Sequence, residues 1–274
     1  MNFKYIKLSL ALISAAAVAI AFDGYMIAVA FVATLVGALV ALEILFWVTV
    51  IALALISAIN PKKKIKSRFY GFVLNSAIIE ICSLARIVIK VNGKERLPDV
   101  PYLLVCNHRS NFDNFILTSV IRDPYLVFIS KPENFKIPFV GLLIKRCGYL
   151  AIDRENPRNA LKTIHASADL VKNENMCVGV FPEGTRGHGE GVAPFSEGCF
   201  LVAKKSACPI VVASLKDTDS IHSRFPRKTT VTLDFVGVID AEDAKMKRSG
   251  ELSDTAYAMI SASYCAALPE KTEN

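Results

Sequence analysis

The first 59 residues almost lack charge. Only 12 of them fall outside the apolar set, and the four charged ones, Lys4, Lys7, Asp23 and Glu43, sum to zero. Such a segment cannot form the water-facing surface of a soluble domain. The other 215 residues carry 30 Lys and Arg against 23 Asp and Glu, and their apolar share of about 46% is ordinary for a globular domain. We therefore expect a membrane anchor followed by one basic folded domain.

Paired cysteines are also lacking. The seven cysteines are an odd number, are widely scattered, and never stand in CxxC spacing. Most have apolar neighbours, which favours buried, reduced thiols that pack as small hydrophobes over a disulfide framework or a zinc site. This usage fits a domain in the reducing cytosol.

Several catalytic signatures are missing. The sequence contains neither GxSxG nor HExxH, which argues against a lipid hydrolase with its own nucleophile or metal. The glycines after position 183 lack the GxGxxG spacing of a dinucleotide site. His165, His188 and His222 are interpreted as surface or core residues. We predict no metal, no cofactor and no nucleic-acid partner.

The apolar N-terminus offers two membrane crossings or an ambiguous three. Uncharged runs cover residues 8–22, 24–42 and 44–60, and about 20 apolar residues span a bilayer. Basic residues flank the region on both sides, and the positive-inside tendency puts both flanks in the cytoplasm, which requires an even number of crossings. We predict a transmembrane helical hairpin over residues 1–60 that turns at Asp23-Gly24. The alternative is a signal peptide cleaved near Ala21, which would leave 25–59 as the anchor.

Residues 61–86 form a second predicted segment. The basic cluster from Lys62 to Arg68 is typical of a stop-transfer flank, and it could also hold anionic lipid headgroups. Residues 69–85 are apolar with Ser76, Glu80 and Ser83 on one helical face, which is the pattern of an interfacial or docking helix.

The pattern of residues 87–274 is that of one α/β domain. Short β-branched runs predict strands, and amphipathic stretches between them predict helices. This alternation indicates a three-layer αβα domain with a mostly parallel or mixed central sheet. The predicted strands are 87–91, 102–106, 125–129, 149–152, 177–181, 210–214 and 229–238, and the predicted helices are 111–121, 138–146, 157–172, 197–205 and 253–267.

The segment NHRSNFD, residues 107–113, follows the second predicted strand. If His108 lies in the turn and Asp113 in the first helical turn, the carboxylate can bond one imidazole nitrogen and leave the other as a general base. This is a Ser-His-Asp arrangement without its serine, so the nucleophile would come from the substrate. Ser110-x-x-Asp113 also resembles a capping box, in which Asp113 only starts a helix.

The segment FPEGTR, residues 181–186, follows another buried strand. It delivers a carboxylate, Glu183, and a guanidinium, Arg186, to one strand end. Arg186 offers a planar fork for phosphate, and Thr185 and the backbone N–H groups near Gly184 are further donors. The alternative is a turn held by a Glu183–Arg186 salt bridge, with no ligand.

Together these two segments resemble the NHxSxxD and FPEGTR blocks of the glycerophospholipid acyltransferases typified by lysophosphatidic acid acyltransferase. Further matching positions include Lys131, the run Ile152-Asp153-Arg154 and the run Pro209-Ile210-Val211, so the resemblance covers about residues 91–236. The sequence departs from the usual pattern at Asn134, at Val212 and at Ser196-Glu197, which leaves the preference for acceptor and acyl chain open.

The resemblance implies acyl transfer from acyl-CoA or acyl-carrier protein to the sn-2 hydroxyl of 1-acylglycerol 3-phosphate, giving phosphatidic acid. It implies that 87–274 is the catalytic domain of an enzyme acting on a membrane lipid. The apolar N-terminus and its basic flanks predict an integral membrane protein whose catalytic domain faces the cytoplasm. By this analogy His108 is the base and Asp113 orients it. The implied substrate-binding residues are Glu183, Gly184, Thr185, Arg186, Lys131 and Arg154. The alternatives are another lysophospholipid or lyso-aminolipid acceptor, or an inert lipid-binding protein.

Overall fold

The computed structural model describes residues 3–59, 68–123, 125–187 and 191–265. It divides into two compact units, residues 1–63 and residues 64–274. The predicted basic cluster at Lys62, Lys63, Lys64 and Lys66 lies outside the described residues.

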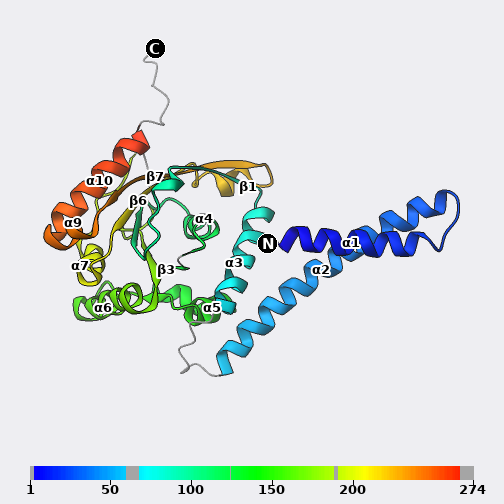
Figure 1. Ribbon diagram of the computed structural model, residues 1–274, viewed down its shortest axis with the longest axis horizontal. Helices are drawn as coiled ribbons and strands as arrows, with labels where there is room; N and C mark the ends of the chain where they lie inside the picture. Colours follow the sequence, from blue (N-terminus) through cyan, green and yellow to red (C-terminus); the bar gives the residue numbers. More distant parts are fainter. Residues whose placement is uncertain (1–2, 60–67, 124, 188–190, 266–274) are drawn as a thin grey trace, which may run out of the picture. The chain divides into compact units, whose positions relative to one another are not determined.

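The N-terminal unit consists of two packed helices, α1 (Phe3–Ala19) and α2 (Tyr25–Ile59), joined by a turn that contains Asp23 and Gly24 (Figure 1). Helix α2 is continuous over its 35 residues, so the region contains two helices rather than three. Among the described residues, α2 alone is long and apolar enough to cross a membrane. At 1.5 Å per residue it measures about 52 Å, more than the roughly 30 Å of a hydrocarbon core.

The ion pair between Lys7 and Glu43 joins these two helices. The ammonium of Lys7 contacts the Glu43 carboxylate, which also accepts a hydrogen bond from the Trp47 indole N–H at 2.8 Å. Pairing offsets the cost of two charges in apolar surroundings.

The second unit is built on one seven-stranded mixed sheet. Its strand order is β1-β7-β6-β2-β5-β3-β4. Strands β6, β2, β5, β3 and β4 are mutually parallel, whereas β7 runs antiparallel to β6 and β1 is parallel to β7. The strand bounds are β1 (Ile87–Asn92), β2 (Leu103–Cys106), β3 (Tyr125–Ser130), β4 (Leu150–Ala151), β5 (Met176–Val180), β6 (Ile210–Lys216) and β7 (Thr229–Ile239).

Helices cover both faces of this sheet. Helices α3 and α4 lie on one side, and α6, α7, α9 and α10 lie on the other (Figure 1). The layers confirm the predicted three-layer α/β fold. The helix bounds are α3 (Arg68–Leu84), α4 (Asp113–Val120), α5 (Val140–Arg146), α6 (Pro157–Glu174), α7 (Leu201–Ser206), α8 (Ile221–Arg224), α9 (Ala241–Met246) and α10 (Ser249–Cys265), with 3-10 turns η1 (Lys94–Arg96), η2 (Pro132–Lys136) and η3 (Glu197–Phe200).

Burial explains why the central strands form where they do. Every residue of β2 and β5 is buried, as expected for parallel strands covered on both faces, whose sequences are continuous apolar runs. Helix α6 begins where the Asn156 side chain accepts hydrogen bonds from the N–H groups of Arg158 and Asn159, with Pro157 in its first turn. Its buried residues Ile164, Ala168 and Val171 repeat at helical spacing and face the sheet.

All seven predicted strands are confirmed, with ends shifted by one or two residues. The predicted helix over 197–205 is a 3-10 turn followed by α7, and the short helices α8 and α9 were not predicted. A four- or six-residue helix spans barely one or two turns, too few to show a 3.6-residue period. The cysteines are free thiols, and five of the seven are buried, as the sequence indicated.

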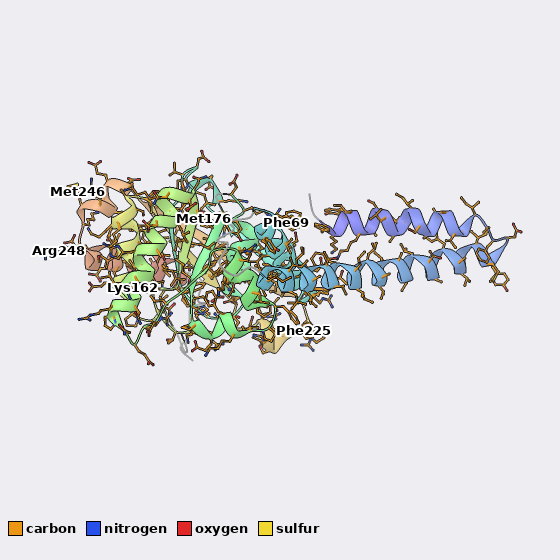
Figure 2. All side chains as sticks on the ribbon, turned by 90° about the horizontal axis from the view of Figure 1, so that it is seen from below. Phe69, Lys162, Met176, Phe225, Met246 and Arg248 are labelled. Carbon is orange, nitrogen blue, oxygen red and sulfur yellow. The ribbon has the colours of Figure 1, made fainter. Side chains whose placement is uncertain are left out.

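Exposed apolar side chains occur at both ends of the second unit. Phe69 and Phe225 lie towards one end, and Met246 lies at the other (Figure 2). Their exposed fractions are 55%, 61% and 76%. Helix α3, predicted as interfacial, therefore presents Phe69 outward while its residues Tyr70, Val73 and Leu74 are buried.

Candidate active site

The sheet brings the predicted site residues to one edge. His108 follows β2, the segment 182–186 follows β5, Lys131 follows β3 and Arg154 follows β4. These four strands are parallel neighbours, so their carboxyl ends meet at the same edge. Ligands of open α/β sheets bind at this edge. Segments that are up to about 80 residues apart in the sequence thus face one region.

His108 and Asp113 form the hydrogen-bonded pair that the sequence predicted. Imidazole Nδ1 lies 2.8 Å from Asp113 Oδ2. Because a carboxylate only accepts, Nδ1 carries the proton and Nε2 is the basic nitrogen. The Asp113 side chain is fully buried, whereas 22% of the His108 side chain is exposed. The pair therefore presents one basic nitrogen from a ring held by a buried carboxylate.

Asp113 also organises the turn before α4. Its Oδ2 atom accepts the backbone N–H groups of Arg109 at 2.6 Å and Ser110 at 2.8 Å. The Ser110 hydroxyl accepts the N–H of Phe112 at 3.3 Å rather than that of Asp113, so only half of a capping box is present. The same oxygen thus organises the helix start and holds the imidazole, and the catalytic role of the pair stays a prediction.

Glu183 joins the two motifs through backbone hydrogen bonds. Its Oε1 accepts the N–H of His108 at 2.6 Å, and its Oε2 accepts the N–H of Ala193 at 3.0 Å. In the opposite direction, the Gly187 N–H donates to the His108 carbonyl at 2.8 Å. Burial raises the pKa of the Glu183 carboxyl, although these N–H bonds act against the shift. Glu183 thus fixes the backbone of His108, and its predicted contact with substrate stays a prediction.

Gly184 and Arg154 lie together at the end of β5. Gly184 has a φ of +75°, which suits glycine, and a Cβ there would lie 3.4 Å from Nη1 of Arg154. Within the described residues Arg154 has no acidic partner, and desolvation lowers its pKa. A guanidinium that is partly desolvated and unpaired is a ready partner for an anion.

Lys131, Thr185 and Arg186 are exposed at the same edge. None of the three forms a side-chain hydrogen bond or ion pair with any residue that the structure describes. A Glu183–Arg186 salt bridge is therefore absent from this part of the chain, and the proposed salt-bridged turn is wrong. The Arg186 fork is left available for a ligand, and Lys131, Arg154 and Arg186 together place three cations at this edge.

Sequence reasoning missed the role of Arg109. Its guanidinium donates to the Gly191 carbonyl at 3.1 Å, lies 3.7 Å from an Asp219 oxygen, and stacks over Tyr264 at 5.5 Å. These contacts connect the turn after β2 with the loop after β5 and with α10. No local pattern signals them, because all three partners are more than 80 positions away.

Asn107 is a second residue whose structural role the sequence reasoning missed. Its fully buried side chain donates to the Leu215 carbonyl at 2.8 Å and accepts the Leu215 N–H at 2.7 Å. This pairing continues the β2–β6 ladder by one step and fixes the residue just before His108. Its position in the first motif is the sequence signal that could have found it.

Comparison with known proteins agrees with this geometry. The family model named Acyltransferase matches residues 88–216, which include both motifs. This segment belongs to the acyltransferase family. The acyltransferase segment resembles 1-acyl-sn-glycerol-3-phosphate acyltransferases of Saccharomyces cerevisiae (31% identity, 49% of this chain and 45% of that one) and Escherichia coli (32% identity, 43% and 48%). The chain thus aligns with less than half of the length of these relatives.

One solved structure is similar in fold to most of this chain. It is the 1-acyl-sn-glycerophosphate (LPA) acyltransferase PlsC from Thermotoga maritima, with a TM-score of 0.60. The match covers 85% of this chain and 98% of that one at 20% identity, and it supports the fold. Among the residues that the structure describes, no group of three His, Cys, Asp or Glu side chains is placed to hold a metal ion.

Proposed function

We propose that this protein transfers an acyl group from a thioester, acyl-CoA or acyl-carrier protein, to the sn-2 hydroxyl of 1-acylglycerol 3-phosphate. The observation that carries the proposal is the His108–Asp113 pair at 2.8 Å, beside three cations at one sheet edge. The named relatives act on this class of acceptor according to their names, which supports the choice of lysophosphatidic acid.

The chemistry needs one base and no protein nucleophile. Nε2 of His108 takes the proton of the acceptor hydroxyl as its oxygen attacks the thioester carbonyl. Asp113 stabilises the imidazolium that forms. The tetrahedral adduct then collapses, the C–S bond breaks, and the leaving thiolate takes the proton back from Nε2. The products are the ester and the free thiol. A thioester is already activated, so we predict that neither a metal nor a cofactor is needed.

The cations account for a phosphorylated acceptor. A phosphate monoester carries nearly two negative charges at neutral pH, and a guanidinium binds it through two parallel hydrogen bonds. Arg186 and Arg154 are suited to this role, with Lys131 and the N–H groups around Gly184 and Thr185 as further donors. This assignment extends the sequence prediction for these residues.

We further propose that the helix pair anchors the enzyme in a membrane with the catalytic unit facing the cytoplasm. The support is the packing of α1 against the long apolar helix α2 as a hairpin, together with the basic residues that lie at both ends of this helix pair on the chain. Reporter fusions before Phe3 and after Arg68 should both report the cytoplasmic side. Opposite locations would mean an odd number of crossings.

A panel of acceptors tests the function. The full chain in lipid nanodiscs is given radiolabelled acyl-CoA or acyl-carrier protein, with lysophosphatidic acid, lysophosphatidylcholine and a lyso-aminolipid as acceptors. We expect phosphatidic acid from lysophosphatidic acid and a rate at least about 10²-fold lower for His108→Ala. Faster turnover of another acceptor would identify a different lysolipid acyltransferase. No transfer to any acceptor would favour the inert lipid-binding alternative.

A further inference from the structure

A column of aromatic rings lies beneath His108. The Phe181 ring stacks on the imidazole with centroids 4.2 Å apart and planes 15° from parallel. The Phe128 ring stacks on Phe181 at 5.5 Å and 12°. Tyr149 follows at 6.1 Å from Phe128. Three rings from three different segments therefore form a stack that ends at the proposed base, and Tyr149, tilted by 40° to Phe128, closes the column.

A glycine makes room for this column. Gly179 of β5 lies opposite Phe128 of β3 in the parallel register. A Cβ at Gly179 would lie 2.5 Å from Cε1 of Phe128, a distance that real Cβ atoms do not show. The absence of a side chain at 179 thus lets the Phe128 ring lie across β5 and contact Phe181. Side chains alternate along a strand, so Phe181, two residues later, returns to the same face.

The stack supplies a restraint that the Asp113 hydrogen bond lacks. One hydrogen bond fixes the position of Nδ1 but lets the ring rock about that contact, because the χ2 torsion of histidine has a broad energy minimum. A parallel aromatic face prevents this rocking. Phe128 is only 3% exposed and Tyr149 only 6%, so the column behind Phe181 is anchored in the core.

We propose that Phe181 is a positioning residue that, supported by Phe128 across Gly179, holds the His108 ring so that Nε2 points at the acceptor hydroxyl. This inference rests on the proposed acyl transfer for its kinetic consequence, and on geometry alone for the order of the ring. Catalysis is sensitive to a misplacement of the base of about 1 Å, which costs about 10²-fold in rate.

Kinetics supply the first test. Phe181→Leu should lower kcat about ten- to a hundredfold with KM for the acceptor changed less than about threefold, because the base and not the binding site is disturbed. Phe181→Tyr, which keeps the ring face, should recover most of kcat. Gly179→Ala should lower kcat in the same direction, although Gly179 is not one of the predicted site residues.

The control separates positioning from stability. Phe200 is fully buried and lies on η3, and Phe200→Leu removes a similar volume from the core. We expect it to lower Tm while leaving kcat unchanged well below Tm. If Phe181→Leu keeps more than half of the wild-type kcat, or Phe181→Tyr loses as much as Phe181→Leu, the proposal is wrong.

A spectroscopic readout makes the test independent of activity. The chain has four histidines, so the Nδ1–H signal of His108 is assigned by its loss in His108→Ala. Phe181→Leu should increase the exchange of this proton with water about tenfold or more, since a ring that rocks breaks the Asp113 bond more often. An unchanged exchange rate overturns the proposal. If the wild type transfers no acyl group, the proposed function fails, but this measurement still decides the role of Phe181.

Discussion

The Glu183 carboxylate accepts the backbone N–H of His108 at 2.6 Å, and this bond ties the second sequence motif to the first. The other oxygen accepts from Ala193. An amide in place of the carboxylate can accept only one of the two N–H groups. We therefore expect Glu183→Gln to lower kcat more than it raises KM, because the backbone of the base loosens. Glu242→Gln, on the exposed face of α9, is the matched control. A pure rise in KM would instead place Glu183 in contact with substrate.

The same carboxyl gives a pH-dependent prediction. Burial raises the pKa of Glu183 above its ordinary value of 4.5. A raised carboxyl pKa means that the folded state holds its proton more tightly than the unfolded state does. Stability from this group is complete below pH 4.5 and is lost as the pH rises through the folded pKa. The free energy of unfolding of the wild type minus that of Glu183→Gln should therefore fall as the pH rises from about 4 to 7. Denaturant titrations at each pH measure this difference in unfolding free energy. A difference that stays constant or rises with pH would contradict a pKa of Glu183 raised by burial.

Asp113 should tolerate replacement by asparagine better than by alanine. Three N–H donors converge on Asp113 Oδ2. Asparagine can still offer an oxygen to them, but it has no charge to stabilise the imidazolium, so kcat should fall while Tm changes little. Alanine leaves buried donors without acceptors and should lower both kcat and Tm. Parallel kinetics and melting curves test this. Equal Tm values for the two variants would show that Asp113 does not organise the turn.

Arg186→Lys tests the phosphate assignment. The lysine keeps the charge but cannot form the bidentate fork, and a charge-assisted contact is worth about 1.5–3 kcal/mol. In this variant kcat/KM for lysophosphatidic acid should be roughly ten- to a hundredfold lower than in the wild type. An acceptor without a phosphate monoester should lose less, and Tm should stay constant, because Arg186 makes no ion pair in the described structure. Equal losses for both acceptors would remove Arg186 from the phosphate site.

The Lys7–Glu43 pair predicts the behaviour of the helix pair. Lys7→Ala leaves the Glu43 carboxylate without its cation in apolar surroundings, which is costly. We expect less full-length protein in the membrane fraction and a lower Tm in detergent when either Lys7 or Glu43 alone is replaced by alanine. The exchange Lys7→Glu with Glu43→Lys should restore both, because the pair is re-formed with its charges reversed. Single variants that match the wild type would show that the pair contributes nothing.

Sequence patterns alone predicted most of the fold. The runs at 102–106 and 177–181 could be assigned to buried strands because β2 and β5 are covered on both faces, which leaves a continuous run without charged side chains. Helix α6 could be assigned from its amphipathic pattern, which is local. The pairing of His108 with Asp113 was also predictable, since five residues of a turn suffice to bring them together.

Only the tertiary structure decided how the site is assembled. Glu183, Arg109 and Phe181 contact partners that are 70 or more positions away or that belong to other strands, and no local spacing encodes such contacts. The sheet order places β2 beside β5 and β5 beside β3, and this order depends on how the whole chain buries its apolar surface. The residue types at the site therefore follow from the sequence. The packing of distant strands decides which carboxylate holds the backbone of the proposed base and which rings stack beneath it.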